Sequence, residues 1–518
     1  MTLDEFLKDL QFNIDRANQD NWEPNWEDSP LAYKLYKGLP VVPLSAEVPL
    51  SLTEYRMPAS PDIEGIGHFL WYAYGISQVS ESVFPEEANP IHSYRRFAPS
   101  GGALYPNELY IYLKIKGLPD GVYHYDPSHH RLVLLRAGNF DSYISAALGE
   151  RCELSSCFGT VFVSTMFWKN FFKYNNFSYR LQGLDAGVLM GQLLESAKRF
   201  GFAVGVYYQY LDSAINHFLG LSENEESIYS VIPLSVETTN WSSNGNGTFN
   251  SQTEDRLKRE LRPIFFERVE RTKNVLEFPK LITMNEAAKF ESTDSFTRLR
   301  NRSYDVRSNQ EVNLPQTESL AYDLAEVSQK RFSPEMDFVL TRISQEQLAV
   351  LLKKSMTSFH YRNDLDDIFS GQEPRVSIYS SLYNVEGIPN GAYYYDSKEH
   401  RLLEIQQGDH RMLLQSGLSF DNVNLQQVPL CLHVACNRDF YQEDLGYRGY
   451  RILQMEAGML VQRLLLTSSA LGLGGHPLLG FNASMADELY KMSEQTSLIQ
   501  IPIGSYRPKP WLRGSLHS

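Results

Sequence analysis

The loop at residues 93–113, SYRRFAPSGGALYPNELYIYL, carries the pattern best suited to binding a ligand. Pro99 and Ser100 precede the glycine pair Gly101 and Gly102, and a strand of alternating residues follows. Because glycine has no side chain, backbone N–H groups at such a turn can approach a flat or anionic ligand. The same residues also describe a tight turn before a strand, and on their own both interpretations stand.

Metal and disulfide chemistry have little support in the sequence. Neither Cys152 and Cys157 nor Cys431 and Cys436 have the C-x-x-C spacing of a zinc or thioredoxin-type site, so we expect buried thiols. The histidines form no pair at the helical i, i+4 spacing. We therefore expect no catalytic metal.

The elements around the glycine loop occur twice in the chain. KGLPDGVYHYDPSHHRLVLL at 116–135 matches EGIPNGAYYYDSKEHRLLEI at 386–405, a shift of 270 residues. Each copy predicts two strands with alternating aromatic residues next to a Pro-Asp-Gly or Pro-Asn-Gly turn. Both copies also close with an apolar strand, SIYSVIPLS at 227–235 and SLIQIPIGS at 497–505.

Each copy also predicts a long helix. YRLQGLDAGVLMGQLLESAKRFGF at 179–202 matches YRILQMEAGMLVQRLLLTSSALGL at 450–473. Apolar residues at helical spacing predict burial, and Gly187 and Gly458 mark points where another helix packs closely. Two copies with the same order of elements predict an α+β fold in which one chain forms its own pseudo-dimer.

A linker separates the two copies. We place copy one at residues 1–236, the linker with a bridging helix at 237–285, and copy two at 286–518. The Ser-, Asn-, Gly- and Thr-rich stretch near 237–255 predicts a flexible connection. The charged sequence RLKRELRPIFFERVERTKNVLEF follows, and its apolar stripe, interrupted at Pro263, predicts a helix with a solvated face.

Composition restricts the partners. The 518 residues are 42% hydrophobic and 21% charged, which is typical of a globular protein of two or three domains. A formal net charge of −14 disfavours nucleic acid and anionic membranes. No apolar run approaches the roughly 20 residues of a membrane-spanning helix, and the N-terminus is unlike a signal peptide. We expect a cytoplasmic protein with no membrane or nucleic-acid partner.

Three motifs together resemble one protein family. PSGGALYPNELYIYL, the later GVYHYD, and GLGG followed by PIG are similar to the SagB/McbC-type azoline dehydrogenases of the FMN-dependent nitroreductase superfamily, here in a tandem-duplicated form. The resemblance covers most of both halves. It implies a nitroreductase-like fold with FMN at the boundary between two subunits, each contributing to the site. In this chain both subunits would be halves of one polypeptide.

The resemblance implies that copy two holds the phosphate and the ring edge of FMN. QKRFSPEMDF at 329–338 resembles the family's phosphate-binding turn, where Arg and Lys supply positive charge and a hydroxyl adds a hydrogen bond. LGLGGHPLLG at 471–480 resembles its glycine loop, and the closing SYRPKPWLR resembles a further phosphate contact. The residues implied are Lys330, Arg331, Ser333, Gly474, Gly475, Arg507, Lys509 and Arg513.

Copy one lacks these cofactor contacts. Residues 33–42, taken as the counterpart of the phosphate-binding turn, contain no Arg and no Ser. Ala203 and Val204 stand where copy two has its glycine pair. The phosphate side of a second site is therefore predicted to be lost.

The side that faces the flavin is implied to come from copy one. The residues implied are Pro99, Ser100, Gly101 and Gly102 opposite the ring, and Lys173 and Tyr174 as a catalytic pair. In copy two, Ser370 and Gly371 remain but the second glycine is lost, and Asp444 and Leu445 replace the Lys-Tyr pair. One complete site therefore predicts one FMN per chain. The alternatives are two sites, or none in a pseudo-dimer that serves as a scaffold.

The resemblance implies a reaction in which FMN accepts a hydride while a base removes the adjacent proton from an azoline ring. Lys173 is the implied base and needs a pKa lowered by burial or by a neighbouring cation. From the residues alone, Lys173 could equally be an exposed lysine on an aromatic-rich loop. Tyr174 would shuttle the proton or hold the ring, and Gly474 and Gly475 would donate backbone hydrogen bonds near flavin N5 and O4.

Three functions stay open at this point. The first is an FMN-dependent dehydrogenase that oxidises a heterocycle in a modified peptide, with oxygen reoxidising the flavin. The second is an NAD(P)H-dependent nitro- or quinone reductase, and the third is a non-catalytic scaffold in a biosynthetic complex. Replacing Lys173 separates them, because only the first should lose turnover and keep its flavin. Whether pseudo-dimers associate into a further homo-oligomer also stays open.

Overall fold

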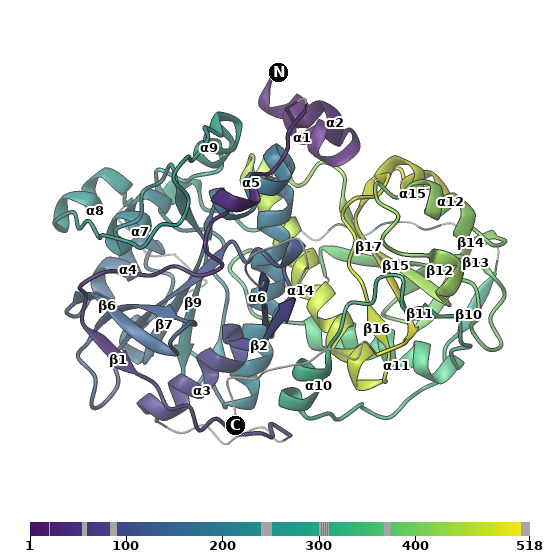
Figure 1. The fold of residues 1–518 in the computed structure, drawn as a ribbon, viewed down its shortest axis with the longest axis horizontal. Coiled ribbons are helices and arrows are strands. Elements are labelled where there is room, and N and C mark those ends of the chain that lie inside the picture. Colours follow the sequence, from purple (N-terminus) through teal and green to yellow (C-terminus); the bar gives the residue numbers. More distant parts are fainter. Residues whose placement is uncertain are drawn as a thin grey trace.

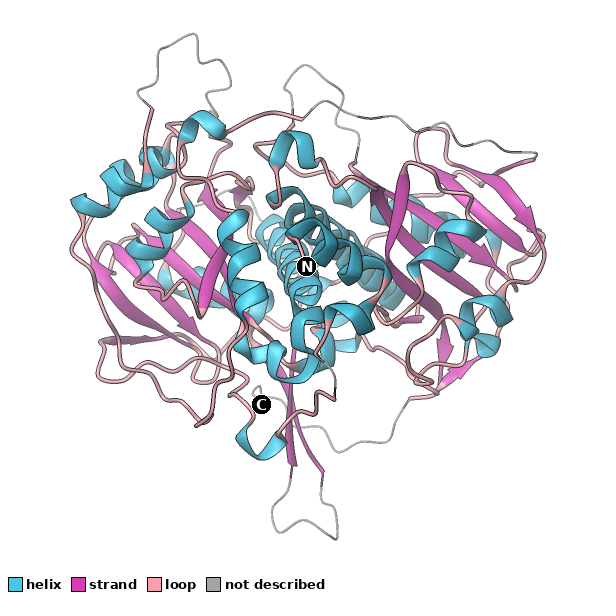
Figure 2. Cartoon of the chain, turned by 90° about the horizontal axis from the view of Figure 1, so that it is seen from above, coloured by secondary structure: helices cyan, strands magenta, loops and turns pink. Residues whose placement is uncertain are grey.

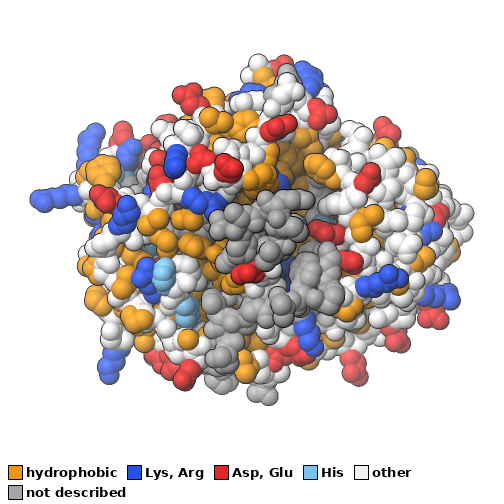
Figure 3. Space-filling model, in the orientation of Figure 1, with side chains coloured by type: hydrophobic (Ala, Val, Ile, Leu, Met, Phe, Trp, Pro, Cys, Tyr) orange, Lys and Arg blue, Asp and Glu red, His pale blue; other side chains and the backbone are white. Residues whose placement is uncertain are grey.

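The computed structural model of the protein describes residues 1–19, 21–53, 60–82, 91–239, 251–299, 302, 304, 306, 308, 310–366 and 374–508. Two antiparallel sheets lie towards opposite ends of the molecule, with long helices between them (Figures 1 and 2). On the face drawn in Figure 3, acidic and basic side chains are interspersed rather than gathered by sign. Across the described ranges, no helix is both long and apolar enough to span a bilayer.

Copy one contains a seven-stranded antiparallel sheet in the order β1-β6-β5-β4-β7-β9-β8. Its strands are β1 (Val41–Pro43), β4 (Asn107–Leu113), β5 (Gly121–Asp126), β6 (Arg131–Ala137), β7 (Gly159–Met166), β8 (Ala203–Val204) and β9 (Glu226–Ser235). Alternate side chains of β4 enter different clusters. Leu109 and Ile111 join the core around α6 (Ser178–Arg199), whereas Tyr110 and Tyr112 pack on the side of α4 (Asp141–Ala147) and α7 (Asp212–Leu219). Both faces of this sheet are therefore covered.

Copy two repeats this arrangement. Its sheet has the order β10-β14-β13-β12-β15-β17-β11, with β16 also paired to β17. The strands are β10 (Glu311–Asn313), β11 (Phe338–Val339), β12 (Val376–Leu382), β13 (Gly391–Asp396), β14 (Arg401–Gln407), β15 (Leu430–Asn437), β16 (Gly474–Gly475) and β17 (Gln495–Tyr506). The predicted tandem α+β fold is confirmed, with β11 as an additional edge strand.

Helices α6 (Ser178–Arg199) and α14 (Arg448–Ala470) pack against each other at the centre of the molecule (Figure 1). A Cβ added at Gly187 would lie 1.9 Å from the carbonyl oxygen of Met455. A Cβ added at Gly458 would lie 2.2 Å from the carbonyl oxygen of Leu184. The close helix packing predicted at these two glycines is confirmed, and it forms the boundary between the copies.

Some of the other helices pack on this pair, and others cover the outer faces of the sheets. They are α1 (Leu3–Phe12), α2 (Ile14–Ala17), α3 (Ile63–Tyr74), α4 (Asp141–Ala147), α5 (Trp168–Tyr174), α7 (Asp212–Leu219), α10 (Leu324–Lys330), α11 (Gln345–Phe359), α12 (Arg411–Ser416), α13 (Gln442–Leu445) and α15 (Ala483–Leu489). A hairpin of β2 (Ile76–Ser82) and β3 (Ile91–Arg96) leads into the glycine loop. The N-terminal segment docks on copy two, where Gln11 Nε2 donates to the Ser497 carbonyl at 2.8 Å. The four cysteines are free and buried, as expected.

The bridging helix expected after the linker is only partly formed. Two short helices, α8 (Glu254–Glu260) and α9 (Pro279–Ala287), flank a stretch without helix. Pro263 lacks an N–H group and disfavours helical backbone in the residue before it. Instead the stretch runs along copy one, where Val269 N–H donates to the Leu35 carbonyl at 2.9 Å. The single charged helix was therefore a wrong prediction.

The strand order corrects one comparison between the copies. β10 occupies in sheet two the place that β1 occupies in sheet one, so the counterpart of residues 329–338 follows β1. The choice of residues 33–42, which precede β1 or lie within it, was therefore wrong. The corresponding stretch is 44–62, of which 54–59 lie outside the described residues.

Candidate active site

A short 3-10 turn at Gly101–Ala103 holds the predicted glycine pair between β3 and β4. Ser100 Oγ donates to Asp185 Oδ2 at 2.6 Å, and Gly101 N–H donates to Asp185 Oδ1 at 3.1 Å. Tyr105 N–H donates to Ser100 Oγ at 3.0 Å. These hydrogen bonds fix the turn against α6.

Gly102 brings this turn to the Lys-Tyr pair. Its φ of +62° lies in the left-handed region that favours glycine. A Cβ added at Gly102 would lie 2.5 Å from the Tyr174 hydroxyl oxygen and 2.9 Å from Lys173 Nζ. The backbone angle therefore favours glycine, and a larger residue would displace the ends of the Tyr174 and Lys173 side chains. Pro99, at the start of the turn, is half-buried.

Lys173 and Tyr174 end helix α5. Lys173 is half-buried, with its Nζ 4.9 Å from the centre of the Tyr174 ring and 5.6 Å from that of Trp26. Burial lowers the pKa of the Lys173 amine, and no carboxylate among the described residues offsets this effect. Burial, and then the charge of Asp185, raise the pKa of the Tyr174 hydroxyl, which therefore stays protonated at neutral pH.

Asp185 is a member of this cluster that the sequence did not reveal. It lies on α6 with 4% of its surface exposed. Burial raises the pKa of its carboxyl to about 7, although the hydrogen bonds from Ser100 and Gly101 oppose the shift. The sequence shows Asp185 only as an acidic residue within an apolar helical stretch, a pattern that is equally typical of a position facing solvent.

Arg331 follows α10 in copy two. Its side chain is 4% exposed, Nη1 lies 3.4 Å from Ser333 Oγ, and Nε has no hydrogen-bond partner. Burial first, and the charge of Arg95 second, lower the pKa of its guanidinium to about 9, while Tyr105 acts in the opposite direction. Arg95 and Tyr105 belong to copy one. The two copies therefore meet at Arg331, and Tyr105 connects it to the turn at Ser100.

Not all residues predicted for the cofactor side join this cluster. Lys330 points to solvent and pairs with Glu326. The side chain of Arg507 is exposed. Lys509 and Arg513, like the copy-two glycine Gly371, lie outside the described residues.

Gly474 and Gly475 form β16 beside the Arg331 turn. A Cβ added at Gly474 would lie 2.4 Å from Pro334 Cγ, and one added at Gly475 would lie 2.8 Å from Leu465 Cδ2. Packing against protein atoms thus requires both glycines. In copy one, Ala203–Val204 holds the equivalent place beside β9.

Comparison with a solved structure shows the fold, and comparison with curated proteins shows which sequences the chain resembles. A crystal structure of an Anabaena variabilis protein assigned as a nitroreductase aligns over 98% of this chain and 99% of its own, with a TM-score of 0.72 and 19% identity. The trifolitoxin-processing protein TfxB of Rhizobium leguminosarum bv. trifolii is 32% identical over 145 residues. The microcin B17-processing protein McbC of Escherichia coli is 28% identical over 151 residues. The chain therefore has the fold of that solved structure and is similar in sequence to TfxB and McbC.

The sequence kinship covers part of each protein. The alignment with TfxB spans 26% of this chain and 38% of TfxB, and that with McbC spans 28% of this chain and 54% of McbC. The chain spans between 38% and 64% of the length of the curated relatives it matches. No family model matches it.

In this nitroreductase-like pseudo-dimer, the place equivalent to the Asp185 cluster is filled by protein. Glu456 occupies on α14 the position of Asp185 on α6, and Arg375 stands where copy one has Pro106. Arg375 Nε donates to Glu456 Oε2 at 2.9 Å, and the Tyr361 hydroxyl also donates to Glu456. The cavity beside them is about 20 Å³. The two halves are therefore unequal at this position.

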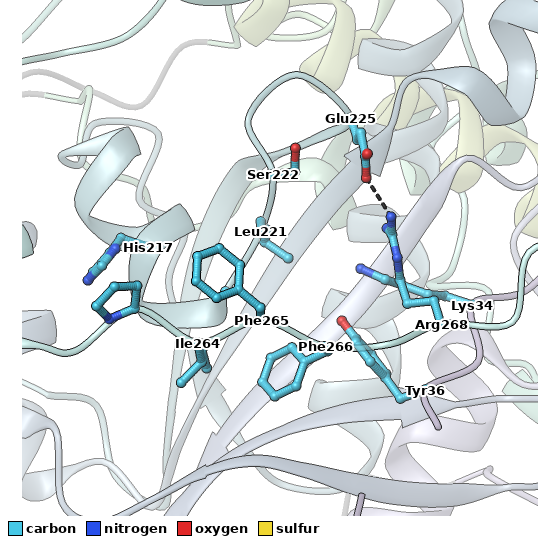
Figure 4. Close-up of a pocket in the computed structure, with 12 residues that line it drawn as sticks. Lys34, Tyr36, His217, Leu221, Ser222, Glu225, Ile264, Phe265, Phe266 and Arg268 are labelled. Atoms are coloured by element: carbon cyan, nitrogen blue, oxygen red, sulfur yellow. Dashed lines mark hydrogen bonds and ion pairs between the residues drawn. The ribbon is translucent and has the colours of Figure 1, made fainter. Parts of the chain in front are cut away.

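A larger cavity lies on the face of sheet one that turns away from α6. It measures about 380 Å³, and its lining includes Lys34, Tyr36, His217, Phe265 and Arg268 (Figure 4). Arg268 pairs with Glu225 there, and Lys34 pairs with Glu226. None of the predicted site residues lines this cavity, and its cations are already neutralised by carboxylates.

Proposed function

We propose that this chain is an FMN-dependent oxidoreductase that dehydrogenates a thiazoline or oxazoline ring in a peptide. Two features carry the proposal: Arg331 is a buried guanidinium with no acid partner among the described residues, and the half-buried Lys-Tyr pair lies against Gly102, in the turn that ends at Tyr105, whose hydroxyl acts electrostatically on Arg331. The guanidinium suits a phosphate, and the Lys-Tyr pair suits proton transfer. Kinship with two proteins named for processing microcin B17 and trifolitoxin favours a peptide substrate.

The residues present fit FMN. Arg331 Nε has no partner, so a phosphate would satisfy it, with Ser333 Oγ as a second donor. Across the boundary, the turn at Gly101 and Gly102 would hold the ring side of the cofactor, next to Lys173 and Tyr174. When bound, FMN supplies a hydride acceptor.

In this proposal Lys173 takes the proton from the carbon next to the one that loses the hydride. Its lowered pKa increases the fraction of neutral amine near pH 7, which a base requires. Tyr174 stays protonated and can donate a hydrogen bond to the substrate ring. The ring loses one proton to Lys173 and one hydride to the cofactor. Molecular oxygen is the final acceptor of the two electrons and forms hydrogen peroxide.

The test uses a synthetic peptide with one thiazoline, incubated in air with the FMN-loaded chain. The expected product is the thiazole, lighter by two hydrogen atoms in a mass spectrum. Lys173→Ala should lower kcat by about 10²- to 10⁴-fold while FMN stays bound. Asp444→Ala is the matched control, because Asp444 stands at the equivalent exposed end of α13 in copy two. It should change neither kcat nor flavin content.

Two results would contradict the proposal. NAD(P)H oxidation with a quinone that survives Lys173→Ala would indicate a reductase that needs the flavin but not the Lys-Tyr pair. A purified chain that takes up no FMN at all would indicate a scaffold.

A further inference from the structure

Asp185 is buried at the centre of the molecule with no cation beside it. It is 4% exposed, and the groups that act on its carboxyl are the Ser100 hydroxyl and the Gly101 N–H, with no charged side chain from the described residues among them. Burying a carboxylate without a cation costs free energy of folding. The presence of Asp185 at this buried position therefore indicates a role that an apolar side chain could not perform.

The turn that Asp185 contacts holds unusual backbone angles. Gly102, Ala103 and Tyr105 have φ values of +62°, +55° and +49°. The left-handed region is costly for Ala and Tyr, so surrounding contacts must hold the turn. Asp185 bonds to Ser100 Oγ and Gly101 N–H, and Ser100 Oγ in turn accepts from Tyr105 N–H. One carboxylate thus ties both ends of the turn to α6.

We propose that Asp185 is a positioning residue of the candidate active site. Its carboxylate anchors the turn so that Gly102 stays against Lys173 Nζ and the Tyr174 hydroxyl. Without that anchor, the turn relaxes towards ordinary backbone angles and the surroundings of the Lys-Tyr pair open. The inference rests on the proposed function, in which this pair is catalytic.

Copy two provides an internal comparison. Glu456 holds the equivalent position on α14, and there Arg375 supplies a cation, with Nε 2.9 Å from Glu456 Oε2. The same helix position therefore accepts an ion pair. In copy one the Asp185 carboxylate instead accepts hydrogen bonds from Ser100 and Gly101. Helix packing would allow a cation at this position, so it does not explain why Asp185 has none among the described residues.

The test compares Asp185→Leu with the wild-type chain. Leucine accepts no hydrogen bond, so amide hydrogen exchange across residues 97–106 should become at least about tenfold faster. The kcat for the thiazoline peptide should fall by about tenfold to hundredfold, with a smaller change in KM. Circular dichroism of the variant at the assay temperature separates this loss from unfolding. Asp185→Asn keeps one acceptor and should restore part of both losses.

Glu456→Gln is the matched control. It alters the equivalent carboxylate in copy two and should change neither exchange across residues 97–106 nor kcat. Wild-type exchange in Asp185→Leu would overturn the proposal, and so would faster exchange with an unchanged kcat. If the wild-type chain itself does not oxidise the thiazoline peptide, the proposed function fails. The exchange measurement needs no FMN, so it still reports whether Asp185 anchors the turn.

Discussion

Arg331 and Lys330 are neighbours in the sequence with opposite surroundings, and this contrast gives a prediction at the residue scale. Arg331 is buried with a free Nε, whereas Lys330 is exposed and paired with Glu326. A hydrogen bond to a charged group contributes about 1.5–3 kcal/mol, so Arg331→Gln should weaken FMN binding by roughly tenfold to hundredfold. Lys330→Gln should leave the Kd unchanged. Quenching of flavin fluorescence measures both values, and equal Kd values for the two variants would exclude Arg331 from the phosphate site.

The carboxyl of Asp185 gives a second prediction at this scale. Burial raises its pKa from 3.8 to about 7, so between these pH values the folded state binds a proton that the unfolded chain has lost. The stabilising contribution of this group is therefore present below pH 4 and is lost as the pH rises to 7. At about 1.4 kcal/mol per pKa unit, the loss is at most roughly 4 kcal/mol. Urea unfolding at pH 5 and pH 8 should show wild type losing stability relative to Asp185→Asn, and parallel profiles would contradict the shift.

At the scale of elements, the sequence predicted those helices and strands that depend on the residues within them. The strands at 121–126 and 131–137 alternate in type, and α6 carries apolar residues at helical spacing, so both were predicted from the sequence. The stretch around Pro263 was not, because Val269 bonds to Leu35, far away in the chain. The anchoring of the glycine turn was missed for the same reason. Asp185 follows that turn by more than eighty residues, and no local pattern links the two.

The packing of α6 on α14 gives a prediction for Gly187. Alanine favours a helix over glycine by about 1 kcal/mol, but its Cβ would lie 1.9 Å from the Met455 carbonyl oxygen. The helices must then move apart, and overpacking costs about 1–3 kcal/mol. Gly187→Ala should lower the free energy of unfolding and the FMN uptake, because the candidate site spans this boundary. Gly65→Ala in α3, whose Cβ would lie 3.2 Å from Asp62 Oδ1, is the control for urea unfolding. Equal midpoints would contradict the prediction.

For the whole molecule, the repeat was enough to predict the pseudo-dimer, since a shift of 270 residues relates whole sets of elements. The same shift relates β1 to β10, so the match of residues 33–42 to 329–338 departed from a register that the repeat already contained. The ion pair by which Arg375 closes the copy-two position equivalent to the Asp185 cluster could not be predicted, because its partner Glu456 is distant in the sequence.

This asymmetry predicts one FMN per chain. In copy one Asp185 holds the turn at Ser100 and Gly101, whereas in copy two Arg375 pairs with Glu456 at the equivalent position and closes it. FMN titrated into the full chain should therefore saturate at a flavin-to-protein ratio of one, measured by absorbance after gel filtration. Arg375→Met should not raise the ratio, because Ala203 and Val204 stand in copy one where the proposed site has Gly474 and Gly475. A ratio near two in the wild-type chain would mean that the ion pair opens to admit a second flavin, and the division of roles between the two copies would then be wrong.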